Sequence, residues 1–590
     1  MRDVIVIGAG GGGPVVAKEL AARGLDVLIL EAGPRFADPE TEWTHYEIDA
    51  NGGYFRFGPV DLSKPAWFRD LPQNSVLQQL SGVGGTTLHY FGNSPRAVPG
   101  VFLNYDGSDR DNYDTAHVFP FSYPELIPYY EWVEYTLPVQ TAPMGTKEEV
   151  FLRGAERFGL PVQTTKDITK AAFRPQENAI LQPGGYAGKT DDPKYLRYPH
   201  SQGCTFCGHC MQGCYLPRGA PRNLKAKRST DNSYMPMALT ADQWAPGKAA
   251  TLITDAFAVK ITTDEQNIAR SVTWRVGRTG ERVTEEAKVI VLAAGNVETP
   301  RLWLNSSLPN PNDQVGRGFT DHFSDALGGI LPFRAGNSKG PGSNARVDFP
   351  GYGAMEQFVG TPAFAASSAT LSDAGIAGYY NNGLPDPGSG ADVVGRLVGR
   401  ELRMVMSDID RVLILVILTD DDVESQNRVT QSPAFPPDEH GPIPRIEIHQ
   451  RTRTVRTLRN REFLAKQAVA LLRAAGAIEV YRFNFPPTMI HVQSTMRMGL
   501  DVRDTVVEES GEARWVKRLF IADNSALANS LGGANPTLTT QALATRTAEK
   551  IFQSCFGGDP WVQKESPVSS TADTVTRADS PVALGAVQLS

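Results

Sequence analysis

The start of the chain carries a strand–helix–strand pattern of apolar positions. Residues 3–7 and 25–30 are apolar runs, while residues 14–23 place apolar side chains at helical spacing. Gly24 follows the helical segment, where glycine commonly ends a helix. The pattern predicts two strands joined by a helix, with the glycine-rich stretch 8–13 as the turn that leads into the helix.

The same periodicities predict further elements, separated by long aperiodic stretches. Helices are expected over residues 123–135, 455–475 and 536–552. Strands are expected over residues 251–262, 282–292, 412–418 and 519–522. Residues 557–590 are rich in Ser, Thr, Ala, Asp and Pro, with too few large apolar groups to offset the entropy of ordering. We therefore expect them to form a flexible tail.

The composition is that of an ordinary globular protein. The chain has 590 residues, of which 41% are hydrophobic and 21% charged, and this length favours two domains over a single core. The net charge is −7 with a pI near 5.8, and the sequence shows no basic arm. Nucleic acid is therefore not an expected partner.

Neither a signal peptide nor a membrane span is expected. The first apolar strand begins at residue 3, and the longest aliphatic run, residues 412–418, is far shorter than the roughly 20 residues that cross a bilayer. We therefore expect a cytoplasmic protein, although export together with a signal-bearing partner subunit would leave no trace in this sequence.

The first glycine-rich turn has the spacing of a dinucleotide-binding site. Gly8 would allow the tight turn after the strand, Gly10 the approach of a pyrophosphate, and Gly13 close packing of helix and strand. The phosphates would lie at the helix N-terminus, which attracts anions. Glu31, at the end of the second strand, is placed to bind ribose hydroxyls. The strand and helix on either side make this a much stronger signal than the glycines alone.

A second glycine cluster favours FAD over NAD as the dinucleotide. Residues 81–87 contain Gly84, Gly85 and Thr86, and a flavin needs such a further close approach of backbone beside its ring. Another strand leads into a glycine turn at residues 293–295, which includes Ala294. Glu31 followed by Ala32 and Gly33 also looks like the flavoprotein form of the unit.

In this order, the motifs make the chain resemble the glucose–methanol–choline (GMC) family of FAD-dependent oxidoreductases. The matching segments are residues 8–13 with Glu31, then 82–87, 293–301, 315–322, 491–499, 521–523 and 535–537. They cover nearly the whole chain in family order. In motif the chain is most similar to sugar-oxidising members, of the glucose or gluconate dehydrogenase and pyranose oxidase kind.

The resemblance implies an α/β fold of two domains. A Rossmann-type FAD-binding domain would be assembled from residues 1–100, 190–325 and 496–556. A substrate domain with an antiparallel sheet would come from residues 101–189 and 326–495.

The resemblance also assigns the catalytic residues. His491 would be the base that takes the hydroxyl proton, a task for which a neutral imidazole is suited near physiological pH. Asn535 would hold the same hydroxyl by a hydrogen bond without titrating. Pro536 would fix the start of the last helix, whose N-terminus favours an anionic reduced flavin. The other cofactor-binding residues implied by the family are Val259, Ala294, Asp523 and Thr537.

Three further positions carry narrower expectations. His89 lies four residues after Gly85, much like the histidine that pyranose oxidases link to the flavin, so it would either be linked covalently or pack beside the ring. His322 belongs to the family's Asp-His pair and is expected to be structural. Ser494 stands where the family usually has glycine, which puts the local backbone in question.

Four of the five cysteines form a compact cluster, C-x2-C-x2-C-x3-C. This spacing favours an iron–sulfur cluster, and the resemblance to cluster-bearing sugar dehydrogenase subunits points the same way. A structural loop without metal and a four-thiolate zinc site are the alternatives. The candidate metal ligands are Cys204, Cys207, Cys210 and Cys214.

The expected activity is FAD-dependent oxidation of an alcohol, with a sugar or glycoside hydroxyl as the leading substrate on resemblance alone. The alternatives are an oxidase of sterols or long-chain alcohols and a flavin-retaining lyase on the same fold. The presence of both His491 and Asn535 argues against a non-catalytic subunit. Dioxygen or an electron-transfer partner would accept the electrons, and a small partner subunit would fit the dehydrogenase alternative.

Overall fold

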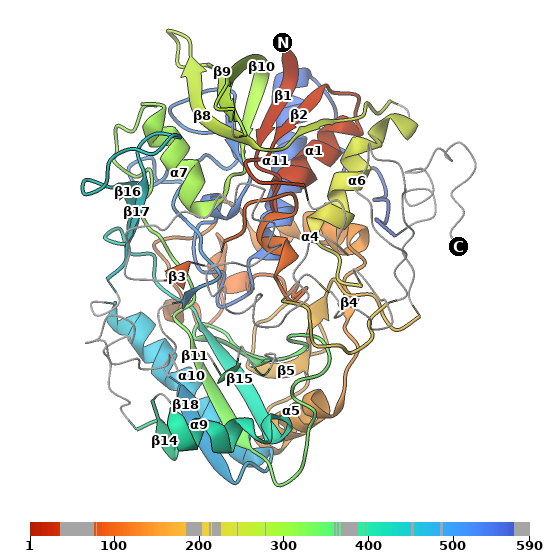
Figure 1. The fold of residues 1–590 in the computed structure, drawn as a ribbon, viewed down its shortest axis with the longest axis vertical. Coiled ribbons are helices and arrows are strands. Elements are labelled where there is room, and N and C mark those ends of the chain that lie inside the picture. The colour runs from red at the N-terminus through yellow and green to blue at the C-terminus, as the bar shows by residue number, and fades with distance from the viewer. Residues whose placement is uncertain are drawn as a thin grey trace.

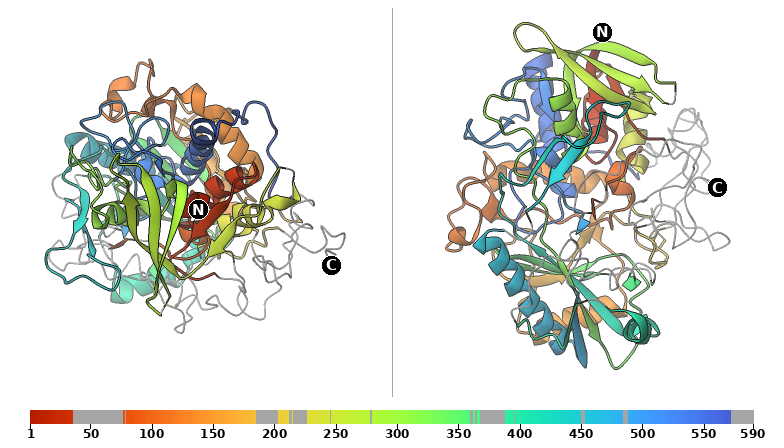
Figure 2. Two further views of the ribbon diagram at one scale, coloured as in Figure 1. Left: turned by 90° about the horizontal axis from the view of Figure 1, so that it is seen from above. Right: turned by 60° about the vertical axis from the view of Figure 1, so that its left-hand side comes forward.

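The computed structural model contains two large sheets at opposite ends of the molecule, with helices and loops between them (Figure 1). The right-hand view of Figure 2 also shows the two sheets at opposite ends of the molecule. The structure describes residues 1–35, 76–77, 79–184, 203–211, 214, 226–244, 246–277, 279–358, 362, 365–366, 388–395, 397–449, 453–483 and 488–571.

The first sheet has the strand order β7-β2-β1-β10-β9-β8, with β20 paired to β10. Its strands are β1 (Arg2–Ile7), β2 (Val27–Leu30), β7 (Thr251–Ile253), β8 (Ala256–Thr263), β9 (Ala269–Val276), β10 (Arg282–Leu292) and β20 (Leu519–Ile521). Val4 pairs in parallel with Val27 on one side and Val289 on the other. The first part of β10 continues antiparallel to β9, so a parallel dinucleotide-binding core is joined to an antiparallel extension.

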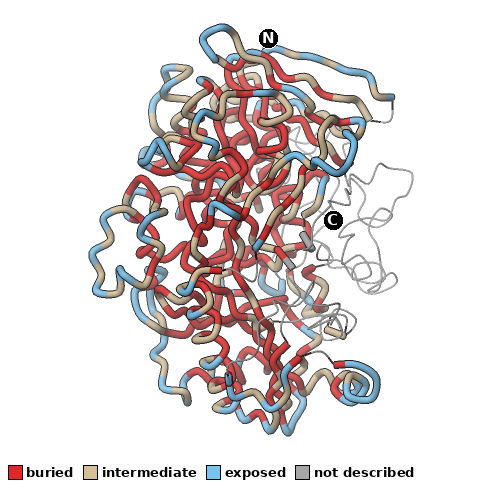
Figure 3. The backbone as a smooth tube through the Cα atoms, turned by 90° about the vertical axis from the view of Figure 1, so that its left-hand side faces the viewer, coloured by how far each residue is buried: buried red, intermediate tan, exposed pale blue. Residues whose placement is uncertain are grey.

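Helices cover this first sheet and share its core. They are α1 (Gly13–Ala21), α4 (Tyr123–Thr136), α6 (Tyr234–Leu239), α7 (Gly295–Asn305) and α11 (Thr537–Phe556). Strand β1 is apolar on both faces, and Val4, Ile5 and Val6 are completely buried in the core that this sheet shares with its helices. Figure 3 shows buried segments, in red, running through the interior of the molecule.

The second sheet has the order β14-β18-β11-β15-β13-β12-β5 and is mainly antiparallel. Its strands are β5 (Ala172–Pro175), β11 (Asp325–Ile330), β12 (Ala345–Phe349), β13 (Gly353–Phe358), β14 (Val393–Val394), β15 (Val412–Thr419) and β18 (Glu479–Phe483). Helices α5 (Thr146–Arg157) and α10 (Val455–Ala474) pack on one face, and α9 (Gly399–Met406) lies at the end near β14.

Shorter elements join these two halves. The paired strands are β3 (Val76–Leu77) with β19 (Thr488–Met489), β4 (Gln140–Thr141) with β6 (Glu177–Asn178), and β16 (Arg428–Gln431) with β17 (Pro444–Glu447). The single-turn 3-10 helices are η1 (Gly85–Leu88), η2 (Pro99–Val101), η3 (Arg110–Asn112), η4 (Thr230–Asn232), η5 (Ala241–Gln243), η6 (Ile409–Arg411) and η8 (Asn524–Ala526).

The α/β fold with a Rossmann-type domain and an antiparallel second sheet is confirmed. The predicted helices and strands lie within a few residues of α1, α4, α10, α11, β10, β15 and β20. The strand expected over residues 251–262 is interrupted at Asp255, which has a left-handed φ of 52°, and so forms two strands, β7 and β8. The interruption lets β7 pair with β2 while β8 pairs with β9.

The expected domain boundary at residue 101 differs from the structure. Phe102, Phe119, Tyr130 and Val133 belong to the same core as the first sheet, because α4 packs against α11. Only later residues, from about α5 onward, join the second sheet. Residues 101–137 therefore belong with the FAD-binding half.

The chain after α11 also differs from the expected tail. Trp561 is only 1% exposed, and its ring lies 3.4 Å from the Arg23 guanidinium. The backbone N–H groups of Trp561 and Val562 donate to Glu549 at 2.7 and 2.8 Å. One buried tryptophan therefore fixes a segment whose average composition predicts flexibility. Residues 572–590 lie outside the described residues.

Candidate active site

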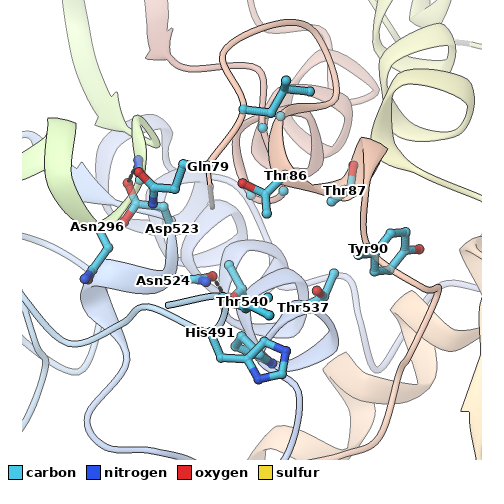
Figure 4. Close-up of a pocket in the computed structure, with 18 of the residues that line it drawn as sticks. Gln79, Thr86, Thr87, Tyr90, Asn296, His491, Asp523, Asn524, Thr537 and Thr540 are labelled. Carbon is cyan, nitrogen blue, oxygen red and sulfur yellow. Dashed lines mark hydrogen bonds between the residues drawn. The ribbon is translucent and has the colours of Figure 1, made fainter. Parts of the chain in front are cut away.

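A long cavity lies between the two sheets, and most of the predicted site residues line it. These are Gly10, Glu31, Gly85, Thr86, His89, Ala294, His491, Asp523, Asn535, Pro536 and Thr537. Figure 4 shows Thr86, His491, Asp523 and Thr537 around the shared space. Segments far apart in the sequence thus meet at one site, as the order of motifs predicts.

Gly8 and Gly13 act behind the cavity wall. A Cβ atom on Gly8, where φ is +108°, would lie 2.2 Å from the Ala293 carbonyl oxygen. A Cβ atom on Gly13 would lie 2.0 Å from the Gly8 carbonyl oxygen. These two glycines allow β1, β10 and α1 to pack closely, whereas Gly10 faces the cavity itself.

Two helix N-termini face the cavity. Helix α1 has Gly12 as its N-cap, and α11 has Pro536; in the described structure neither cap residue gives a side-chain hydrogen bond, and neither first turn holds an acidic residue. The first N–H groups of a helix have no intrahelical partner and carry a positive partial charge. This arrangement fits the pyrophosphate of FAD at α1 and an anionic ring at α11.

The Glu31 carboxylate links the backbone of the first glycine-rich turn, at Ala9, to the backbone at Gly33. One carboxylate oxygen accepts the Ala9 N–H and the other the Gly33 N–H, both at 2.8 Å. Burial raises the pKa of Glu31 above its ordinary value. The Gly82 N–H also donates to this carboxylate, so three of its about four acceptor positions are used, and the remaining one fits the predicted contact with ribose hydroxyls.

The second glycine cluster touches the first. Gly84 and Gly85 have φ of +102° and +48°, and a Cβ atom on Gly85 would lie 2.6 Å from the Cα of Gly10. Thr86 lines the cavity, but Gly84 and Val259 are not among its lining residues. In the case of Val259 the wall is formed by its neighbours, residues 256–258.

Asn296 is a lining residue that the motifs do not predict. Its Oδ1 accepts the Thr495 N–H at 3.2 Å and the Thr495 hydroxyl at 2.9 Å. The amide orientation is therefore set, and Nδ2 is buried with no hydrogen-bond partner in the part of the chain that the structure describes. A buried donor of this kind fits an acceptor atom on a bound flavin nucleotide. The Asp523 carboxylate, in contrast, accepts hydrogen bonds from the Gly295 N–H at 2.9 Å and the Thr299 hydroxyl at 2.6 Å.

His89 lies in the cavity wall and is 4% exposed. Burial is the main cause that lowers its pKa to about 3, with the nearby Lys227 ammonium adding to the effect. A neutral His89 imidazole fits both alternatives, a covalent link to the flavin and simple packing beside its ring. The covalent link therefore stays a prediction, and flavin that remains with acid-precipitated protein would establish it.

His491 and Asn535 meet at the cavity. The Asn535 amide nitrogen lies 3.4 Å from His491 Nε2, while Asn535 Oδ1 accepts a hydrogen bond from Arg346 Nη1 at 2.9 Å. Because a guanidinium only donates, this contact orients the amide with its N–H groups toward His491. The structure thus brings the predicted catalytic pair together at the cavity, with an imidazole nitrogen of His491 beside the amide nitrogen of Asn535.

The other side of His491 is held by the Asp-His pair. His491 Nδ1 lies 2.9 Å from His322 Nδ1, and its backbone N–H donates to Asp321 at 2.8 Å. Burial, His322 and the cationic Arg346 together hold the pKa of His491 well below its ordinary value. The imidazole is therefore neutral at physiological pH. Burial raises the pKa of Asp321 to about 7.

Arg346 is the centre of a polar network that sequence patterns do not reveal. Its side chain is completely buried, and it donates to Asp348 at 2.6 Å, to Glu356 at 2.6 Å and to the Gly533 carbonyl at 2.8 Å. Glu356, which lines the cavity, also accepts from Asn93 at 3.0 Å. Arg346 and Asp348, two positions apart on β12, and Glu356, which pairs with Arg346 from β13, are the one sequence signal that this face of the sheet is not an ordinary apolar core.

The cysteine loop packs behind the cavity and presents Met211 to it. Cys204, Cys207, Cys210 and Cys214 are free thiols, and burial raises the pKa of Cys210 to about 11. Among the described residues, no three His, Cys, Asp or Glu side chains are arranged to hold a metal ion. The structure therefore gives no support to the iron–sulfur or the zinc alternative.

Ser494 has the strained backbone that its departure from the family pattern suggests. Its φ is 76°, in the left-handed region, and its hydroxyl is buried with no partner among the described residues. The neighbouring Gln493 and Thr495 fix this conformation through backbone and side-chain hydrogen bonds.

Across the described ranges, no helix is long and apolar enough to cross a bilayer.

Family models match three parts of the chain. Two models described as GMC oxidoreductase match residues 195–324 and 424–544, and one described as an FAD binding domain matches residues 3–45. These segments contain the cysteine loop, β10, His491, Asn535 and the first glycine-rich turn.

Characterised relatives align over nearly the whole chain. A 2-methyl-1,2-propanediol dehydrogenase of Mycolicibacterium austroafricanum is 25% identical over 93% of this chain and 95% of its own. The fructose dehydrogenase large subunit of Gluconobacter japonicus is 25% identical over 93% and 97%. The paromamine 6'-oxidase of Streptomyces fradiae is 26% identical over 93% and 91%.

Solved structures show the same fold. Pyridoxine 4-oxidase from Mesorbium loti superposes with a TM-score of 0.57 at 15% identity, covering 93% of this chain and 98% of its own. A formate oxidase variant from Aspergillus oryzae superposes with a TM-score of 0.58 at 11% identity, over the same shares. These structures show the fold, and the two GMC oxidoreductase models together with the FAD binding domain model place the chain in the GMC oxidoreductase family of FAD-dependent enzymes.

Proposed function

We propose that the protein oxidises a hydroxyl group of a sugar or another polyol, with FAD as the hydride acceptor and His491 as the base. The observation that carries this proposal is the neutral His491, whose Nε2 faces Asn535 in the FAD cavity. An alcohol bound between them would place its hydroxyl proton on His491 Nε2 and its hydroxyl oxygen at the Asn535 N–H.

When bound, FAD supplies a two-electron acceptor for the hydride of the carbinol carbon. The protein residues handle the proton. His491 takes it from the hydroxyl as the C–H bond breaks, so that the carbinol becomes a carbonyl. Asn535 holds the oxygen throughout and does not titrate, and Arg346 keeps the Asn535 amide in the donating orientation.

The wall opposite the flavin side supports a substrate with more than one hydroxyl. Asn93 lines the cavity and donates to Glu356, which leaves Asn93 Oδ1 buried without a partner among the described residues. Such an acceptor fits a second hydroxyl. Phe91 and Phe358, whose ring centroids are 5.2 Å apart, provide apolar surface for the carbon skeleton.

The names of the relatives agree with this substrate class. They include enzymes named for a diol, for fructose and for an aminoglycoside, paromamine. A long-chain-alcohol oxidase of Arabidopsis thaliana, 22% identical, keeps the long-chain alternative as the second candidate. The relatives are named as both oxidases and dehydrogenases, so dioxygen or an electron-transfer partner is the proposed acceptor.

The test is anaerobic flavin reduction by the FAD-loaded protein. Sugars, glycosides, sterols and aliphatic alcohols are mixed with it one at a time, and bleaching of the flavin bands is followed. The proposal expects polyols to reduce the flavin faster than monohydric alcohols of similar size. Reduction by sterols or long-chain alcohols alone would favour the second candidate. Cleavage of a hydroxynitrile without bleaching would establish a lyase instead.

A further inference from the structure

The hydrogen bonds of His322 determine where its proton lies. His322 Nε2 is 3.0 Å from the Ser530 carbonyl oxygen, and a carbonyl can only accept. Nε2 therefore carries the hydrogen. The ring is 2% exposed, and burial lowers its pKa to about 4, so it is neutral and holds one hydrogen only. Its Nδ1 is left with a lone pair.

This lone pair determines which ring nitrogen of His491 carries the hydrogen. The two Nδ1 atoms lie 2.9 Å apart, and their rings meet at 73° with centroids 4.9 Å apart. One hydrogen must lie between the two nitrogens for this contact to be favourable. Since His322 Nδ1 has none, His491 Nδ1 must donate. His491 then carries its lone pair on Nε2.

The contacts of His491 Nε2 lead independently to the same tautomer. Asn535 presents its amide N–H there, because Arg346 Nη1 occupies Asn535 Oδ1 at 2.9 Å. A donor opposite Nε2 is compatible with a lone pair and not with a second N–H. Each group in this chain thus donates to the next. Arg346 donates to Asn535, and Asn535 to His491 Nε2. His491 Nδ1 donates to His322, and His322 Nε2 to the Ser530 carbonyl.

We infer that His322 is a positioning residue, which holds His491 in the Nδ1–H tautomer and so makes Nε2 the basic nitrogen of the site. The inference rests on the proposed function, in which Nε2 accepts the hydroxyl proton. The opposite tautomer would present an N–H group to the substrate hydroxyl and could not accept that proton. The role goes beyond the structural one that the Asp-His pair suggests, because it fixes a proton and not merely a ring.

Two substitutions of His322 separate the hydrogen-bonding role from the packing role. In His322→Gln, the amide N–H can still donate to Ser530 and the amide oxygen can still accept from His491 Nδ1. In His322→Leu, a side chain of similar bulk offers neither group. Anaerobic flavin reduction is measured with the polyol that reduces the wild type fastest, and FAD content confirms that each variant is folded.

The inference expects His322→Leu to slow flavin reduction by about 10²–10⁴-fold, the usual contribution of a base, with the apparent substrate affinity changed by less than about threefold. His322→Gln should recover most of that loss. Equal losses in both variants, or a wild-type rate in His322→Leu, would overturn it.

A second readout does not depend on turnover. Nitrogen-15 NMR of histidine-labelled FAD-loaded protein distinguishes protonated from unprotonated ring nitrogens. The wild type should show His491 protonated on Nδ1 and unprotonated on Nε2, and His322→Leu should lose this preference. The opposite tautomer in the wild type would overturn the inference. The expected tautomer in a protein that no alcohol reduces would instead contradict the proposed function.

Discussion

The two walls of the cavity recognise their ligands in different ways. The wall on the first sheet exposes backbone at the glycine turns of Gly10 and Gly85 and at the N-termini of α1 and α11. The wall on the second sheet is made of side chains, with Glu356 and Phe358 from β13 and Val416 and Leu418 from β15.

The difference explains what each wall can do. A backbone wall requires small residues at fixed spacing, and it suits a dinucleotide whose phosphates bind backbone N–H groups. A side-chain wall can change with each substitution while the sheet behind it stays the same. The proposed catalytic pair, His491 and Asn535, lies where the two walls meet, because Asn535 precedes α11 while its amide is oriented by Arg346 of β12.

The largest effect is expected on the backbone wall, from Gly10→Val. A Cβ atom there meets no described atom closer than 3.9 Å, so the protein should fold, while the rest of the side chain would occupy the pyrophosphate position. Purified protein should lack the flavin bands and fail to regain them with added FAD. Gly12→Ala is the contrast, since its Cβ would lie 1.8 Å from the Ala522 carbonyl oxygen and should impair folding itself. A yellow Gly10→Val protein would contradict the assignment of this wall.

Where the walls meet, Asn535→Ala should slow flavin reduction by roughly 10- to 100-fold, the value of one or two hydrogen bonds. The variant loses the donor to the substrate oxygen and leaves Arg346 without one acceptor. FAD content should not change. Stopped-flow reduction measures the effect, and an unchanged rate would mean that the amide does not contact the reacting hydroxyl.

On the side-chain wall, Asn93→Leu should reduce the rate about tenfold with a polyol, because one hydrogen bond to a second hydroxyl is lost. A monohydric alcohol of similar size should be affected by less than about threefold. The pair glycerol and 1-propanol provides the comparison. Equal losses with both would show that Asn93 supports the wall without contacting substrate.

The smallest effect is expected at Ser494. Ser494→Gly removes a side chain held at φ 76° and a buried hydroxyl without a partner in the described structure, so it should raise the free energy of unfolding by about 1 kcal/mol. Urea unfolding followed by flavin release and fluorescence measures the change. A loss of stability would show that the serine hydroxyl has a partner after all.

The backbone wall could be predicted from the sequence, and much of the side-chain wall could not. Glycine spacing, the strands around it and the Asn535-Pro536-Thr537 start of α11 are local features with fixed geometry. The contact of Arg346 with Asn535 joins residues 189 positions apart and depends on how the second sheet faces the first. No local pattern encodes that orientation.

Two other differences have a similar cause. The composition after residue 557 predicts a tail because it averages over the segment, whereas one tryptophan, Trp561, is enough to anchor it against Arg23 and Glu549. The sequence predicts helix α4, yet it does not say which of the two cores this helix covers. The sequence thus predicts elements and turns better than it predicts their partners.

The central claim is that a neutral His491 takes the hydroxyl proton, and His491→Ala tests it most directly. The FAD-loaded variant and the wild type are mixed anaerobically with the same polyol, and the rate constant of flavin reduction is compared at saturating substrate. General base catalysis accounts for about 10²–10⁴-fold, so the variant should be slower by that factor while it keeps its FAD. Flavin reduction at the wild-type rate in His491→Ala would contradict the account.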